Sequence, residues 1–159
     1  MSIIGIVAID QNFAIGKGGT LPWHYPGDMR FFKQTTIKNA VVMGRRTWET
    51  LNRPLPDRMN IVLTNSNSSP VDGIIRLPTV ASVLTLAKTL TRDLFVIGGA
   101  KVYKAFLPHI DRWIVTEVPL SVEDADTFLP ANFLDEFELY EMLQLEQDLR
   151  VKFYERRTR

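Results

Sequence analysis

The sequence contains no cysteine and two histidines. Without cysteine the protein has no disulfides, no thiolate nucleophile and no cysteine-ligated zinc or iron–sulfur centre, and this composition fits a reducing compartment. His24 and His109 lie far apart in the sequence with no second histidine beside either, so we expect each to be a surface side chain. The sequence therefore predicts no metal site.

Charge of either sign is not in excess, and long apolar runs are missing. The 19 Lys and Arg residues nearly balance the 18 Asp and Glu residues, which gives a formal net charge of +1 and no broad basic field for nucleic acid. No window approaches the roughly 18 apolar residues of a membrane span, and the N-terminus has neither a basic flank nor a cleavage pattern. We expect a soluble, cytoplasmic protein that binds a small molecule and contacts neither nucleic acid nor membrane.

The chain alternates strand-like and helix-like segments. Residues 3–9 are uniformly apolar, as in a central strand covered on both faces. Further strands are predicted at 40–44, 59–64, 73–77, 93–97 and 112–118, and helices at 28–37, 45–51, 82–90 and 100–107. Such alternation favours a mainly parallel sheet with helices on both faces. Two final strands, 136–143 and 150–157, have no helix between them and predict an antiparallel hairpin.

The length and the 45% hydrophobic content predict one α/β domain covering residues 1–159. We expect a mixed sheet of about eight strands and about four helices. In the helix at 28–37, Met29, Phe31 and Phe32 are placed to share the inner face. The glycine- and proline-rich stretch 11–27 is predicted to be an irregular loop that contacts a ligand.

Two glycine turns between a strand and a helix could bind phosphate. In VVMGRRTW, Gly44 precedes Arg45, Arg46 and Thr47, which suit a pyrophosphate or a 2′-phosphate; in FVIGGAKVY, a Gly-Gly pair lets the backbone approach a ligand. Alternatively, the glycine pair is a tight turn and the arginines are solvated. Neither GxxxxGK[ST] nor a GxGxxG that follows a strand is present, which weakens kinase and Rossmann interpretations.

Seven segments resemble dihydrofolate reductases of the bacterial, chromosomal type. They are IVAIDQNFAIGKGGTLPW, Asp28 followed by a Phe-Phe pair, VVMGRRTWE, NRPLPDRMNIVLT, FVIGGAKVY, the threonine of IVTEV, and DTFLP. They occur in the order and spacing of that family from residue 3 to about residue 130, and the C-terminal hairpin fits its last strands. The resemblance implies NADPH-dependent reduction of 7,8-dihydrofolate to tetrahydrofolate, with hydride transfer to C6 and protonation of N5, in support of one-carbon and thymidylate metabolism.

The resemblance assigns four catalytic residues. Asp28 would pair with the pterin ring N–H and 2-amino group, while the N5 proton would come from water admitted near the flexible loop. Trp23 would hold an active-site water, Thr116 would hydrogen-bond the Asp28 carboxylate, and Tyr103 would lie near the nicotinamide. On residue type alone, Asp28 is equally an ordinary acid at a helix N-terminus, and the other three are ordinary buried amphipathic side chains.

The substrate site implied by the resemblance has an apolar wall and one cation. Arg58 would bind the α-carboxylate of the glutamate tail through its forked donors. The full predicted set is Ile6, Val7, Ala8, Leu21, Asp28, Phe32, Leu51, Leu55, Arg58, Ile97 and Thr116.

The NADPH site implied by the resemblance follows the two glycine turns and the loop that closes over the nicotinamide. The Gly98-Gly99 peptide is expected to be cis, as in the family. The predicted cofactor-binding residues are Ala8, Ile15, Gly16, Gly19, Thr20, Gly44, Arg45, Arg46, Thr47, Leu63, Thr64, Asn65, Ile97, Gly98, Gly99, Ala100, Lys101, Val102 and Tyr103.

The resemblance further implies a monomer that is inhibited by antifolates such as trimethoprim or methotrexate. Two alternatives remain open at this point. One is a reductase of another pterin or of a flavin precursor on the same fold, and the other is a non-catalytic module that binds folate or a nucleotide.

Overall fold

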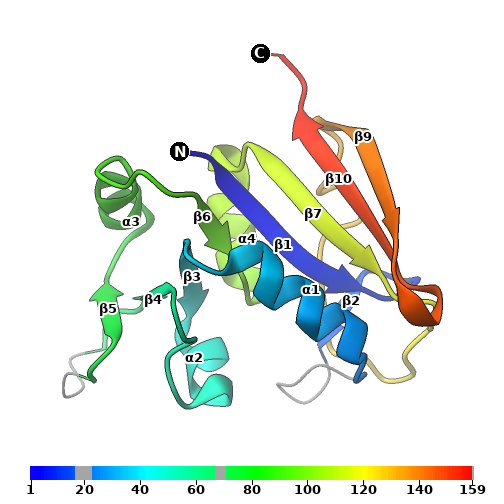
Figure 1. The fold of residues 1–159 in the computed structure, drawn as a ribbon, viewed down its shortest axis with the longest axis horizontal. Helices are drawn as coiled ribbons and strands as arrows, with labels where there is room; N and C mark the ends of the chain where they lie inside the picture. Colours follow the sequence, from blue (N-terminus) through cyan, green and yellow to red (C-terminus); the bar gives the residue numbers. More distant parts are fainter. Residues whose placement is uncertain (17–22, 67–70, 159) are drawn as a thin grey trace.

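The computed structural model describes residues 1–16, 23–66 and 71–158, which form a sheet with helices on both faces (Figure 1). In this described part the main sheet has eight strands in the order β5-β4-β3-β6-β1-β7-β10-β9. The strands are β1 Ile3–Ile9, β3 Ala40–Gly44, β4 Met59–Leu63, β5 Ile74–Leu77, β6 Leu94–Val96, β7 Arg112–Glu117, β9 Phe137–Gln144 and β10 Arg150–Arg156. All pairs from β5 to β7 are parallel, and β10 pairs antiparallel with β7 and β9. The predicted mixed sheet and C-terminal hairpin are confirmed.

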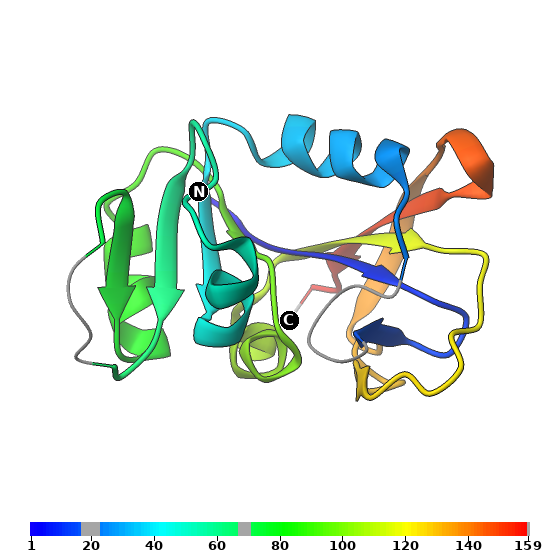
Figure 2. The same cartoon turned by 90° about the horizontal axis from the view of Figure 1, so that it is seen from below.

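Among residues 1–16, 23–66 and 71–158, four α-helices cover the two faces: α1 Pro26–Thr36, α2 Arg45–Leu51, α3 Val80–Ala87 and α4 Ala100–Phe106. Apolar side chains of α1 and α2 pack on one face with Ile4, Ile6 and Ile114, whereas those of α3 and α4 pack on the other with Val7 and Val115. In Figure 2, α1 lies above the sheet and α4 below it. Because strand side chains alternate, one face of β1 and β7 is assigned to α1 and the opposite face to α4.

The central strand β1 needs a glycine in its middle. A Cβ atom built on Gly5 would lie 2.5 Å from ring atoms of Trp113, which is closer than real side-chain contacts allow. Trp113 is 1% exposed and packs edge-on against Phe133, with ring centroids 5.0 Å apart. The indole therefore occupies the space that any larger residue at position 5 would need.

Several predicted boundaries change in the structure. Helix α1 begins at Pro26, which suits the first helical position because its missing N–H has no partner there in any case. Met29 is 57% exposed, so its predicted place on the inner face is wrong, whereas Phe31 and Phe32 do pack against the core. The start of α3 at Val80 follows from a capping box between Thr79 and Ser82.

The predicted irregular loop at 11–27 contains a short strand. β2, Ala14–Gly16, pairs antiparallel with β8, Thr127–Phe128, in a separate two-stranded sheet. Asp10 holds this arrangement, since its carboxylate accepts hydrogen bonds from the N–H groups of Asn12, Ala14 and Val122 at 2.8–2.9 Å. Such short strands carry too little alternation to be predicted from the sequence.

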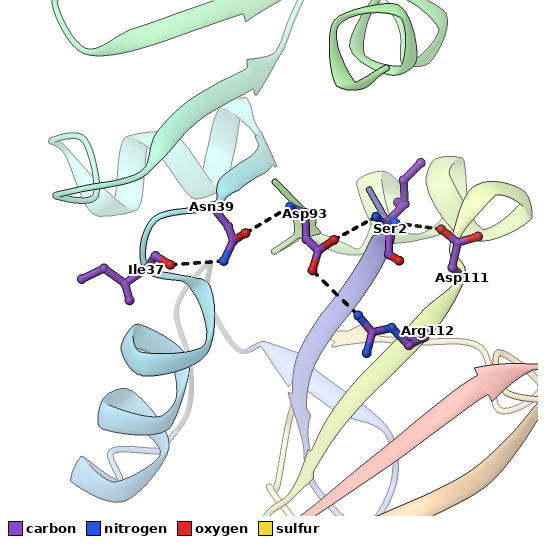
Figure 3. Close-up of polar contacts among 7 residues, drawn as sticks. Ser2, Ile37, Asn39, Asp93, Asp111 and Arg112 are labelled. Atoms are coloured by element: carbon purple, nitrogen blue, oxygen red, sulfur yellow. Dashed lines mark hydrogen bonds and ion pairs between the residues drawn. The ribbon is translucent and has the colours of Figure 1, made fainter. Parts of the chain in front are cut away.

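The amino ends of the parallel strands are tied together by a polar network (Figure 3). Asp93 accepts from the N–H of Ser2 at 2.9 Å and lies 3.8 Å from the Arg112 guanidinium. Asp111 accepts from the N–H of Ile3 at 2.8 Å, and Asn39 accepts from the N–H of Asp93 at 3.0 Å. These bonds join the amino ends of β1, β6 and β7 to the residue that precedes β3. None of the described helices has the length and apolar character that crossing a membrane requires.

Candidate active site

The predicted catalytic acid lies at the carboxyl ends of β1 and β7. Ala8 of β1 pairs in register with Thr116 of β7, and Asp28 projects toward them from the first turn of α1. The Thr116 hydroxyl hydrogen-bonds the Asp28 carboxylate, as the resemblance implied. Burial raises the pKa of Asp28 above its ordinary value, and the Thr116 hydrogen bond opposes that rise. The carboxylate is thus held in a place where its charge is costly without a cationic or N–H partner.

Tyr103 lies on α4, which covers the face of the same strands opposite to α1. Its hydroxyl donates a 2.7 Å hydrogen bond to the carbonyl of Ile6, and its ring lies 5.6 Å from that of Trp113. Burial raises the pKa of Tyr103 strongly, and the nearby charge of Asp28 raises it further. Tyr103 therefore stays protonated and anchors the backbone of β1 from below, two residues before Ala8.

The predicted apolar wall is largely assembled on the α1 face of the sheet. Ile6 belongs to the core cluster on this face, and the partly buried side chains packed against it include Phe32, Leu51, Leu55 and Ile97. The side chain of Val7 belongs instead to the cluster on the α4 face, so the structure does not bring it to this wall. Leu21, Gly19 and Thr20 lie outside the described residues.

Arg58 lies at the outer edge of the wall. Its Nη1 donates to the Thr36 hydroxyl at 3.0 Å, its Nε donates to the Pro56 carbonyl at 3.0 Å, and its guanidinium carbon lies 6.0 Å from the centre of the Phe32 ring. Burial lowers the pKa of Arg58, and the Asp57 charge opposes that change. Because an arginine in such a place stays charged, the site offers a fixed cation at one end and a carboxylate at the other.

Trp23 presents a buried donor. Its indole nitrogen makes no hydrogen bond to any group in the described ranges. A buried N–H without a partner costs free energy, so a bound water or ligand oxygen is the natural acceptor at this position. The residue fits the water-holding role that the resemblance implied.

The two glycine turns meet at the carboxyl ends of β3 and β6. The N–H of Gly44 donates to the carbonyl of Gly98 at 2.9 Å, and the Gly98-Gly99 peptide is cis, as expected. Gly98 has φ +123°, a conformation that side-chain-bearing residues rarely adopt, and a Cβ there would lie 3.7 Å from the Thr47 hydroxyl. The glycines thus leave room for a ligand to approach the backbone of Gly44 and Gly99 closely, while Gly98 itself is buried.

A cavity of about 90 Å³ lies beyond these turns. It brings Arg45 and Thr64, both predicted cofactor residues, together with Ser66 and Arg76, which sequence reasoning missed. The Glu49 carboxylate also lines the cavity and lies 3.5 Å from Arg45 Nε. The two guanidinium groups and two hydroxyls still give a net cationic donor set that suits a phosphate monoester such as a nucleotide 2′-phosphate. An arginine within the strand at 73–77 was the available signal. The pairing of β4 with β5, which sets Arg76 opposite Val62, decides that it reaches the cavity lined by Thr64.

The other predicted cofactor residues differ in exposure and in the face of the sheet on which they lie. Arg46, Asn65 and Lys101 are exposed, whereas Ala100 is half-buried beside the Gly-Gly turn. The side chains of Ile15, Leu63 and Val102 pack in the core on the α4 face; that of Val102 is buried, and those of Ile15 and Leu63 are partly exposed. Gly16 belongs to β2.

A larger cavity, of about 780 Å³, lies near the ends of β1, β7 and the β9–β10 hairpin. Its lining includes Asp10, Phe13, Glu117 and Arg150, and it shares no residue with the predicted site. We place the chemistry at Asp28, because the acid, the apolar wall and the glycine turns converge there.

Known proteins resemble this chain over nearly its whole length. The family model described as dihydrofolate reductase matches residues 2–157. The dihydrofolate reductase of Bacillus subtilis is 40% identical over 113 residues, which cover 71% of this chain and 67% of that protein. That of Haemophilus influenzae is 36% identical over 134 residues, covering 84% of this chain and 82% of that protein.

A bifunctional dihydrofolate reductase-thymidylate synthase from Daucus carota is 39% identical over 151 residues, and this chain spans 28% of its length. A solved structure of dihydrofolate reductase from Enterococcus faecalis, complexed with NADP(H) and RAB-propyl, superposes with a TM-score of 0.90 at 32% identity and covers 99% of this chain and 97% of that one. Together with the geometry of the site, these matches show that the chain belongs to the dihydrofolate reductase family.

Proposed function

We propose that this protein catalyses the NADPH-dependent reduction of 7,8-dihydrofolate to 5,6,7,8-tetrahydrofolate. The observation that carries the proposal is Asp28, a carboxylate held by Thr116 in a place where burial raises its pKa. A buried acid with a perturbed pKa beside an apolar wall is a recurrent signature of a catalytic site.

Asp28 binds and orients the pterin. Its carboxylate accepts hydrogen bonds from the ring N–H and the 2-amino group, and these charge-assisted bonds offset the cost of burying the charge. The negative charge also favours protonation of the pterin, because a developing cation on the ring is stabilised by a nearby carboxylate. The N5 proton comes from water, for which the buried indole N–H of Trp23 is a ready donor site.

The cofactor, when bound, supplies a hydride to C6. The chain's own contribution is to hold it: the backbone at Gly44, Gly98 and Gly99 accommodates its close approach, and Arg45 and Arg76 bind the 2′-phosphate with Thr64 and Ser66. The donor set fits NADPH better than NADH, since forked cationic donors suit the 2′-phosphate that only NADPH carries.

Arg58 favours folate over other pterins. A guanidinium held 3.0 Å from the Thr36 hydroxyl at the outer edge of the wall suits a substrate with a carboxylate tail. A reductase of another pterin or of a flavin precursor has no need of that cation. A purely binding module has no need of an acid with a raised pKa.

Steady-state NADPH oxidation with and without dihydrofolate tests the proposal. Oxidation that depends on dihydrofolate supports it. Oxidation that depends on a pterin without the glutamate tail, but not on dihydrofolate, indicates the alternative reductase. Binding of both ligands without oxidation indicates the non-catalytic module.

Three further expectations accompany the proposal and stay predictions. A monomer is tested by sedimentation, a cytoplasmic location by cell fractionation, and inhibition by trimethoprim or methotrexate by titration of the NADPH oxidation rate. The extent of the chain as one domain is tested by whether it unfolds in a single cooperative transition.

A further inference from the structure

Asn60 is a buried polar residue near the start of an apolar strand. It lies on β4 between Met59 and Ile61, is 2% exposed, and pairs in register with Val41 on one side and Ile74 on the other. A buried amide is costly unless its donors and acceptor are satisfied, so its partners show what it does in the fold.

Its side chain is bound entirely to the loop that precedes β4. In the described part of the chain, Asn60 Oδ1 accepts from the N–H of Leu55 at 2.8 Å, and Nδ2 donates to the carbonyls of Leu55 and Arg58, each at 2.9 Å. The Asn60 amide thus bonds both backbone groups of Leu55, as a neighbouring strand would, and also donates to the carbonyl of Arg58. These three bonds connect β4 to the loop that carries two predicted substrate contacts.

The loop also contains two prolines, Pro54 and Pro56, and a left-handed residue at Asp57. Asp57 has φ +58°, a left-handed conformation that is unfavourable for most residues with a side chain. Its carbonyl accepts from the N–H of Lys38 at 2.9 Å, on the connection after α1. A turn of this kind persists only where surrounding contacts enforce it, and the Asn60 amide supplies three of them.

The position of Arg58 follows from that support. With its carbonyl held by Asn60, the side chain extends to Thr36 of α1, whose hydroxyl in turn donates to the carbonyl of Phe32 at 2.8 Å. Among the described residues these contacts use Nε and Nη1, so Nη2 can meet a ligand anion. Leu55, held at the same amide, forms part of the apolar wall.

We propose that Asn60 is a positioning residue that fixes Arg58 and Leu55 relative to Asp28, and that it thereby selects substrates with a carboxylate tail over bare pterins. The proposal rests on the proposed function and names the determinant of its substrate class. Asn60 reaches no ligand itself, since its amide is occupied by the loop.

The test uses two substrates, dihydrofolate and 6-methyl-7,8-dihydropterin, which has no tail. Asn60→Asp keeps the acceptor for Leu55 but removes both donors and sets a negative charge against two carbonyls. We expect its KM for dihydrofolate to rise about tenfold with kcat little changed, which corresponds to about 1.4 kcal/mol. With the tail-less pterin we expect kcat/KM to stay within about twofold of wild type.

Asn39→Asp is the matched control. Asn39 precedes β3, the strand beside β4, but its side chain binds the carbonyl of Ile37 and the N–H of Asp93 and not the loop before β4. Its replacement therefore tests a loss of stability without removing the bonds that hold Leu55 and Arg58. We expect it to leave the ratio of the two substrates' kcat/KM values at the wild-type value. In an Arg58→Ala background, Asn60→Asp should lose its dihydrofolate-specific effect, because the group that it positions is gone.

Equal losses on both substrates, or no loss on either, overturn the positioning role while leaving the proposed function intact. Should Asn60→Asp fail to fold, Asn60→Ser retains one hydroxyl for the same backbone atoms and is held to the same criterion. A wild-type protein that oxidises no NADPH with dihydrofolate overturns the proposed function, and this inference with it.

Discussion

The two ends of the sheet treat aspartate in opposite ways. At the amino ends of the strands, Asp93 and Asp111 accept hydrogen bonds from the N–H groups of Ser2 and Ile3, and Asp93 also faces Arg112 (Figure 3). At the carboxyl ends, Asp28 meets the hydroxyl of Thr116 in surroundings that raise its pKa. The aspartates at the amino ends hold the strands together, whereas the aspartate at the carboxyl ends is available to bind a ligand.

The difference shows how one residue type acquires two roles. A carboxylate that accepts backbone N–H groups and faces a guanidinium stabilises the folded chain. A carboxylate whose charge is disfavoured by burial stabilises the free protein less, and a cationic or N–H-bearing ligand recovers that cost on binding. The groups that surround each carboxylate, and not its residue type, separate Asp93 and Asp111 from Asp28, the proposed catalytic acid.

The largest expected effect is on catalysis at the carboxyl end. Asp28→Asn should lower kcat/KM for dihydrofolate by about 10² to 10⁴, because the charge that orients the pterin and favours its protonation is lost. Steady-state NADPH oxidation at neutral pH measures it. Asp93→Asn is the matched control at the other end and should keep wild-type kinetics; near-normal rates for the Asp28 variant would contradict the assigned role.

At the amino end the expected effect is on stability. Asp93→Ala removes the acceptor for the Ser2 N–H and the partner of Arg112, and we expect it to lower the free energy of unfolding by about 1 to 3 kcal/mol with kcat unchanged. Urea denaturation monitored by tryptophan fluorescence measures the change. Asp93→Asn, which retains the acceptor, should lower the free energy of unfolding by less. Equal losses in the two variants would show that the hydrogen bond to Ser2 does not contribute to stability.

Arg58→Lys tests the cation at the outer edge of the site. Lysine cannot donate to Thr36 and Pro56 while also presenting a fork to a carboxylate, so we expect KM for dihydrofolate to rise about tenfold with little change in kcat. Initial-rate kinetics over a range of dihydrofolate concentrations measures both constants. An unchanged KM would show that the tail is bound elsewhere.

The smallest expected effect is a pH-dependent gain in stability from Asp28→Asn. The folded pKa of Asp28 lies above its unfolded value, so the stability that its proton contributes is present in full below the ordinary aspartate pKa and is lost as pH rises through the raised folded pKa. The variant should therefore be more stable than wild type at neutral pH, and the two should converge in acid. Thermal melting of the ligand-free proteins from about pH 4 to about pH 7 measures the difference; a gap that widens toward acid would reverse the assigned direction.

Much of the fold follows from local patterns. Strand and helix periods placed the parallel strands, the C-terminal hairpin and the four helices, because buried faces impose period 2 or period 3.6 on the residues that form them. The same reasoning failed at Met29, whose neighbours Phe31 and Phe32 fill the inner face while Met29 is 57% exposed. It also missed β2 and β8, which are too short to show a period.

The site was predicted through its motifs and less completely through its contacts. Asp28, Thr116 and Arg58 stand in recognisable segments, and the structure brings Asp28 and Thr116 together. Asn60, Ser66 and Arg76 carry no motif of their own. Asn60 stands out as a polar residue within the apolar run MNIVLT, but the sequence does not show which groups its side chain binds.

The sequence by itself determined the element types, the absence of thiol chemistry and the side chains available at each turn, because these depend on neighbours within a few residues. Only the tertiary structure decided which polar groups meet. Asp93 and Ser2 are 91 positions apart, Asp111 and Ile3 are 108 apart, and Arg58 and Thr36 are 22 apart. Hydrogen bonding and burial depend on which groups are close in space. They therefore decide whether an acid stabilises the fold or is available to bind a ligand.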